Sequence, residues 1–146
     1  MVLKRNYLYD NGISNYSGGS TIRVTKITVP DENDYRVAEA LESLGIKRNL
    51  ALLLTYLRVV NWCSSREIEV STGLRQPEVS IAMRTLRENG WIDEREIKRE
   101  GKGRPTKVYA LRQSMDEIIK YYENQKIQES DHIMHAISRL KALSSA

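Results

Sequence analysis

The chain has 146 residues, of which 40% are hydrophobic and 29% are charged, the composition of a folded, soluble protein rather than a disordered one. No apolar run approaches the roughly 18 residues of a membrane span, and the basic segment 1–10 lacks the apolar core of a secretory signal. The single cysteine, Cys63, can form neither an internal disulfide nor a zinc site by itself. We therefore expect a cytoplasmic protein that does not associate with a membrane.

Positive charge is concentrated in two parts of the chain, which has a net charge of +4. Residues 1–30 carry four basic and one acidic side chains, and residues 65–113 carry eleven basic and eight acidic ones, so each segment has a charge of +3. The segments 31–64 and 114–146 each have a charge of −1. This mild basic excess is compatible with a polyanionic partner.

The first thirty residues are expected to form a flexible N-terminal tail or arm. Residues 11–20 are rich in Asn, Gly and Ser, which is typical of turns and linkers. Residues 21–29 are rich in β-branched side chains and favour an edge strand or an extended arm that ends at Pro30.

A helical pattern begins at Asp31, one of three candidate N-caps before apolar residues spaced three and four apart up to Leu44. The segment 49–60 is apolar on nearly all sides, which predicts a buried central helix. Ser64 and Glu67 have the spacing of a capping box and predict a short helix that ends at Gly73.

The next helix is predicted to begin at Gln76-Pro77, because proline is favoured in the first helical turn, and to end at Asn89-Gly90. Two strand-like segments follow at 91–98 and 106–111, and a basic, glycine-rich turn joins them. Trp91 is expected to pack in the core or against this ribbon. The predicted buried face of the helix consists of Val79, Ala82, Met83 and Leu86.

A long C-terminal helix is predicted to begin at Ser114 and to be amphipathic at both ends. Its polar centre, residues 123–130, predicts a break, with Ser130 or Asp131 as a new cap. An apolar stripe that follows a closed domain can be buried by a second chain, so we expect a homodimer. The alternative is a helix that folds back on its own domain. The candidate dimerisation residues are Met115, Ile119, Tyr122, Ile133, Ile137 and Leu140.

This order of three helices, a proline-initiated helix and a two-stranded ribbon is that of a winged helix-turn-helix. The sequence STGLRQPEVS (71–80), continued to Ile92, resembles the segment shared by MarR-, ArsR- and TrmB-type regulators. GKGRPTKVY (101–109) resembles the wing of the same superfamily. The resemblance covers about residues 34–113 and is strongest over 66–112.

What the resemblance implies is a mostly α fold with a small β-ribbon (α+β). The winged helix-turn-helix domain is expected at 31–113, followed by a dimerisation helix at 114–146. The implied function is a homodimeric transcriptional regulator that binds double-stranded DNA at specific sequences.

The helix predicted at 76–88 is expected to lie in the major groove, where its outward side chains can reach base edges. Gln76, Ser80 and Arg84 are the candidates for reading bases. The wing is expected to contact the minor groove or the flanking phosphates. The complete set of candidate DNA contacts is Arg75, Gln76, Pro77, Ser80, Ile81, Arg84, Arg87, Lys102, Gly103, Arg104 and Lys107.

Two residues on this helix depart from the pattern of similar regulators. Ile81 stands where a polar or basic side chain is common, so it either packs on a thymine methyl group or indicates weaker, less specific binding. Glu78 would repel phosphates unless it accepts a hydrogen bond from a cytosine amino group. Two alternatives therefore stay open: a non-specific, chromatin-like DNA-binding protein, and a winged-helix protein-interaction module, which the acidic residues of the ribbon favour.

Catalytic and metal sites are not expected. His132 and His135 lie one helical turn apart and could bind Zn²⁺ with Asp131 and a ligand from a second chain, but no cysteine pair or further histidine supports this. Cys63 is expected to be a small buried hydrophobe. No phosphate-binding loop or catalytic triad is recognisable, so we predict neither enzymatic activity nor a cofactor, and no effector can be named.

Overall fold

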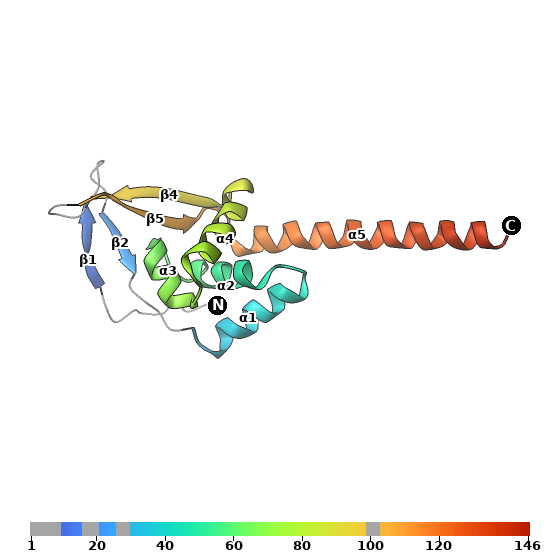
Figure 1. Ribbon diagram of the computed structural model, residues 1–146, viewed down its shortest axis with the longest axis horizontal. Coiled ribbons are helices and arrows are strands. Elements are labelled where there is room, and N and C mark those ends of the chain that lie inside the picture. Colours follow the sequence, from blue (N-terminus) through green and yellow to red (C-terminus); the bar gives the residue numbers. More distant parts are fainter. Residues whose placement is uncertain (1–9, 16–20, 26–29, 99–102) are drawn as a thin grey trace. The chain divides into compact units, whose positions relative to one another are not determined.

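The computed structural model describes residues 10–15, 21–25, 30–98 and 103–146. The chain divides into two units, with the boundary between Gln113 and Ser114. Figure 1 shows the helices and the β-ribbon of the first unit. Its elements from residue 30 onward are α1 (Glu32–Ser43), α2 (Arg48–Leu57), β3 (Cys63–Ser64), α3 (Ser65–Thr72), α4 (Gln76–Glu88), β4 (Ile92–Ile97) and β5 (Thr106–Leu111).

Helix α1 begins as the sequence predicts, with Asp31 as its N-cap. The Asp31 side chain accepts a hydrogen bond from the Asp34 N–H, and the Asp34 carboxylate accepts one from the Asp31 N–H, each at 2.9 Å. Helix α2 is the central helix and is buried on most sides, but it ends at Leu57, three residues earlier than predicted. The most deeply buried large side chains of the helical core are Leu53, Leu54, Leu57, Ile68 and Leu86.

Helices α3 and α4 form the predicted helix-turn-helix. The Ser64–Glu67 capping box is present: Glu67 Oε2 accepts from the Ser64 N–H at 2.7 Å, and Ser64 Oγ accepts from the Glu67 N–H at 3.3 Å. Gly73 follows α3 with a φ of +76°, a left-handed conformation that favours glycine and turns the chain toward α4. The four residues predicted for the inner face of α4 are all buried.

The ribbon predicted after α4 is confirmed and belongs to a three-stranded antiparallel sheet of order β3-β5-β4. Ile92 pairs with Leu111 and Ile97 with Thr106, so β4 and β5 are joined along their whole length (Figure 1). Ile97 and Val108 form a small buried cluster against which Trp62 packs. The ribbon of β4 and β5 is the wing of a winged helix, and the predicted α+β fold class is confirmed.

The structure of residues 10–15 differs from the linker that their composition predicts. Asp10–Asn15 forms strand β1, which pairs antiparallel with β2 (Thr21–Thr25). The β-branched side chains of the β2 residues favour an edge strand or an extended arm, and the structure has the strand. The β1 residues carry no such signal. They can still form a strand, because the main chain supplies the hydrogen bonds of a ladder whatever the side chains are.

The second unit is the single helix α5 (Met115–Ser144). Ser114 caps it as predicted and accepts a hydrogen bond from the Glu117 N–H at 3.2 Å. The predicted break at 123–130 is wrong, and Ser130 lies inside the helix. This segment lacks Gly and Pro, and Lys126 and Glu129 form an ion pair at 2.9 Å along it. Among the described residues, no helix is long and apolar enough to cross a membrane.

Candidate nucleic-acid interface

Helix α4 presents one row of polar side chains on its outer face. Gln76, Ser80 and Arg84 are all exposed and follow one another at four-residue intervals, so they lie along the same side of the helix. Ile81 adjoins this row and is 60% exposed. An exposed Pro77 occupies the first turn, as expected. The structure thus brings together most of the side chains that sequence reasoning selected on this helix.

The side chain of Glu78 makes a hydrogen bond at the start of α4. Its Oε2 accepts a hydrogen bond from the backbone N–H of Arg75 at 2.7 Å, and the side chain is half-buried. A guanidinium group has no acceptor, so the Arg75 side chain cannot complete a reciprocal cap and is left to point elsewhere. The carboxylate of Glu78, which the sequence predicts to be unfavourable for DNA binding, is therefore a helix-capping group.

Of the predicted DNA contacts on the wing and on or just before α4, four cationic side chains have no ion-pair partner among the described residues. Arg75, Arg84, Arg104 and Lys107 are all exposed, and none of them joins a described carboxylate. Desolvating such a group against a phosphate requires no existing ion pair to be broken, which makes these cations suitable contacts for an anion.

Arg87 differs from these four cations because it links α4 to the wing. Its Nε donates to Glu94 Oε1 on β4, and its guanidinium lies over the Tyr109 ring of β5, 5.8 Å from the centroid. The hydrogen bond to Glu94 raises the pKa of Arg87. Sequence reasoning missed this arrangement, because the three residues belong to three different elements, α4, β4 and β5, that come together only in the fold.

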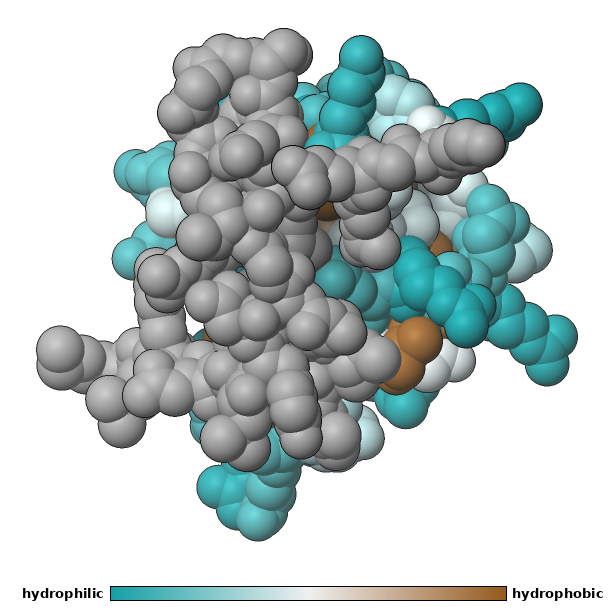
Figure 2. All heavy atoms as spheres, turned by 90° about the vertical axis from the view of Figure 1, so that its left-hand side faces the viewer, coloured by the Kyte–Doolittle hydropathy of each residue, from teal (hydrophilic) through white to brown (hydrophobic). Residues whose placement is uncertain are grey.

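The ribbon between Ile92 and Leu111 carries charges of both signs, several of them paired. Asp93 accepts a hydrogen bond from Arg112 at 2.8 Å, and Arg95 lies over the Trp62 ring, 4.9 Å from the centroid. Since Glu94 is also paired, two of the acidic residues that favour a protein-interaction module are already neutralised. On the side of the molecule that Figure 2 draws, the described side chains that are visible are mostly hydrophilic.

Only part of the predicted wing contact can be located. Gly103 has a φ of +155° and is exposed, as are Arg104 and Lys107. Lys102 lies outside the described residues. The described part of the predicted wing site therefore consists of one glycine and two cations.

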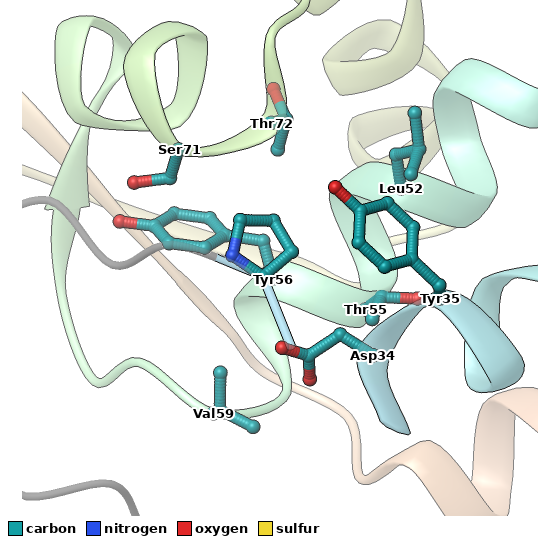
Figure 3. A pocket seen from close by; sticks show the side chains of 9 residues that line it. Asp34, Tyr35, Leu52, Thr55, Tyr56, Val59, Ser71 and Thr72 are labelled. Atoms are coloured by element: carbon teal, nitrogen blue, oxygen red, sulfur yellow. The ribbon is translucent and has the colours of Figure 1, made fainter. Parts of the chain in front are cut away.

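A pocket with mainly apolar walls lies between α1, α2 and α3 (Figure 3). Asp34 lines it, and its Oδ1 accepts a hydrogen bond from Arg58 at 3.1 Å, with both side chains about nine-tenths buried. The charge of Asp34 is therefore matched inside the protein. The other lining residues are Pro30, Tyr35, Leu52, Thr55, Tyr56, Val59, Ser71 and Thr72.

Cys63 is fully buried and donates its S–H to the Tyr109 carbonyl oxygen at 3.6 Å. Burial, with the nearby Glu67 carboxylate, raises the pKa of the Cys63 thiol well above its usual value. Both effects suppress the reactive thiolate. We expect a disulfide reagent at pH 8 to label the native thiol at least about a hundredfold more slowly than the unfolded one.

The same thiol sets a direction for the pH dependence of stability. Its folded pKa is raised, so its contribution to stability is complete at pH values below the unfolded pKa of about 8.5, where the unfolded thiol is still largely protonated, and is lost as the pH rises through that value toward the folded pKa. If Cys63 were labelled as fast in buffer as in denaturant, both the predicted slow labelling and the raised pKa of the folded thiol would be contradicted.

The candidate dimerisation residues lie along α5. Ile119, Ile133, Ile137 and Leu140 are between 39% and 65% exposed. Met115 and Tyr122 are half-buried, and burial raises the pKa of Tyr122. These exposed side chains form an apolar stripe without a partner among the described residues.

The two histidines considered as metal ligands, His132 and His135, are exposed on α5. Within the described part of the chain, no group of three or more His, Cys, Asp or Glu side chains could hold a metal ion.

Comparisons with known proteins support the fold. No protein-family model matches the sequence, and no curated protein matches it. Among solved structures, TrmBL2, an archaeal chromatin protein with a novel mode of DNA binding, is similar with a TM-score of 0.55 and 14% identity. The match covers 75% of this chain and 39% of TrmBL2, so the chain corresponds to about two-fifths of that protein.

A possible transcriptional regulator from Methanosarcina mazei Go1 also matches, with a TM-score of 0.48 and 14% identity, over 88% of this chain and 97% of the other. At such identities, the likeness to TrmBL2 establishes the winged-helix fold and leaves the function to be argued from the site itself.

Proposed function

We propose that this protein binds double-stranded DNA and regulates transcription, with α4 in the major groove and the wing on the flanking groove or backbone. The observation that carries the proposal is the exposed row of Gln76, Ser80 and Arg84, beside Arg75, on a proline-initiated second helix of a helix-turn-helix. That TrmBL2 binds DNA with a related fold supports the same assignment.

Each side chain of the row suits a particular contact in the groove. Gln76 can form two hydrogen bonds to adenine and Arg84 two to guanine, and the Ser80 hydroxyl can pair with either. Ile81, exposed beside them, fits the methyl group of thymine. Together they give α4 the means to distinguish bases, while Arg75 is suited to a phosphate.

The regulator is proposed to be a homodimer held together by α5. The stripe from Ile119 to Leu140 exposes several large apolar side chains, which a second copy would remove from water. A two-fold dimer presents two copies of α4 and favours a pseudo-palindromic site with half-sites about 34 Å apart.

Salt-dependent binding to duplexes tests this function. Fluorescence anisotropy of genomic-fragment and random duplexes, titrated over salt, should show tight binding to some fragments and a steep salt slope, with two chains per site. Equal binding to every duplex would favour a chromatin-like coating protein. Absence of binding at low salt would overturn the proposal and favour a protein-interaction module.

The wing is expected to contribute mainly through charge. Replacing Arg104 and Lys107 together by alanine should flatten the plot of log Kd against log salt by up to about two units, because each lost phosphate contact releases about one counterion fewer. The matched control is Arg36→Ala with Arg48→Ala, which removes two exposed arginines from α1 and α2. Equal slopes for the wing variant and the unmodified protein would exclude the wing from the interface.

A further inference from the structure

The apolar stripe of α5 is interrupted by two opposite charges at its centre. In a heptad repeat, positions a and d face the partner helix. If Ile119 occupies an a position, Tyr122 occupies the following d position, and the next a and d positions are Lys126 and Glu129. Lys126 and Glu129 form an ion pair at 2.9 Å within the helix. The core positions that follow are Ile133, Ala136, Leu140 and Leu143.

The central charges discriminate between the two ways of pairing a second copy. In a parallel pair, each core position faces its own equivalent, so Lys126 would face the partner's Lys126 and Glu129 the partner's Glu129. Like charges placed opposite each other at an interface are unfavourable. In an antiparallel pair, a positions face d positions, and each lysine can meet a glutamate of the other chain.

The antiparallel register that joins these charges also matches the apolar residues. When Lys126 faces the partner's Glu129, Tyr122 faces the partner's Ile133 and Ile119 faces the partner's Ala136. Met115 then faces the partner's Leu140. Each apolar layer combines residues of different shape or size, and no charged side chain faces an apolar one.

We infer that α5 pairs with a second copy of itself in antiparallel orientation, centred between Ile127 and Gln128, with Lys126 and Glu129 fixing orientation and register. A buried polar pair at core positions is a recognised means of specifying register. The inference rests on the proposed homodimer. With a rise of 1.5 Å per residue, this antiparallel register places the Ser114 residues of the two chains about 40 Å apart along the helix pair. That distance is comparable with one turn of DNA.

Mixed disulfide formation tests the orientation directly. Tyr122→Cys and Ile133→Cys are prepared as separate full-length proteins, mixed under exchange and oxidised. We expect a disulfide-linked heterodimer in the mixture and little cross-linking of either variant alone, since the two copies of residue 133 would lie about 16 Å apart along the axis. Native Cys63, fully buried, is retained, and the unmodified protein reports its background.

Efficient cross-linking of each variant alone would show a parallel pair and overturn the inference. Cross-linking in neither sample, together with the same result for the second register pair Ile119→Cys and Ala136→Cys, would exclude this pairing of α5. The cross-linking experiment contains no DNA, so a failure to cross-link would count against the pairing of α5 and not against DNA binding. The duplex titration described above tests DNA binding separately.

A charge exchange supplies an independent test. Lys126→Glu alone should raise the dimer dissociation constant by at least about tenfold, and Lys126→Glu with Glu129→Lys should restore it, because the exchanged charges again meet opposite partners. Lys120→Glu makes the same charge change off the stripe, at an exposed site, and is the matched control. A double variant no better than the single one would contradict the antiparallel register.

Discussion

Replacing Arg75 and Arg84 together by alanine is expected to weaken duplex binding by about 2–6 kcal/mol, which is at least about thirtyfold in Kd. Both side chains are exposed, on or just before α4, and neither has an ion-pair partner among the described residues. Arg84 stands in the row with Gln76 and Ser80, so its loss should also relax the preference at one base pair. Anisotropy against a preferred duplex and its single-base variants measures both effects.

The control for this experiment is the Arg36→Ala, Arg48→Ala variant, which lowers the net charge by the same amount. Those two arginines pair with Glu32 and Glu42 on α1. If the control weakens binding as much as the α4 variant, the effect is one of overall charge and α4 is not the contact. A uniform loss across all duplexes would assign Arg84 to phosphate rather than to a base.

Asp34→Ala is expected to lower the free energy of unfolding of the winged helix by about 3–5 kcal/mol, because it leaves the Arg58 guanidinium buried without its partner. The substitution also removes the carboxylate that accepts from the Asp31 N–H. Urea unfolding followed by tryptophan fluorescence measures this unit alone, since Trp62 and Trp91 both belong to it.

Two variants separate the buried ion pair from general helix effects. Glu32→Ala breaks an exposed pair with Arg36 in the same helix and should change stability by less than about 1 kcal/mol. Asp34→Ala with Arg58→Met should recover part of the loss, because no buried charge remains. An Asp34→Ala variant as stable as Glu32→Ala would show that the buried pair contributes little.

Local signals in the sequence predicted the helix-turn-helix well. The capping residues Asp31, Ser64 and Ser114 each mark the true start of a helix, and the positive φ of Gly73 lies at the predicted end of α3. Such signals work because a cap is satisfied by residues three positions away, whatever the rest of the fold does. The inner face of α4 follows in the same way from its helical period.

Features that depend on distant residues or on backbone pairing were not predictable. The link from Arg87 to Glu94 and Tyr109 arises only when α4 meets the sheet, so the sequence predicts for Arg87 only a DNA contact or a solvated position on the helix surface. Strand β1 has a linker-like composition. The polar centre of α5 predicts a break because it lacks an apolar stripe, but a helix can continue without one, and the Lys126–Glu129 pair supports it locally.

Hydrogen–deuterium exchange with and without a saturating DNA duplex tests the central claim most directly, because it locates the interface on the chain. We predict slower exchange in the peptides that cover the start of α4 and residues 103–107. Helices α1 and α2 should exchange at the same rate in both samples, apart from any effect of overall stabilisation. Slower exchange confined to α1 and α2, or no change at a duplex concentration that saturates binding, would contradict the placement of α4 in the groove.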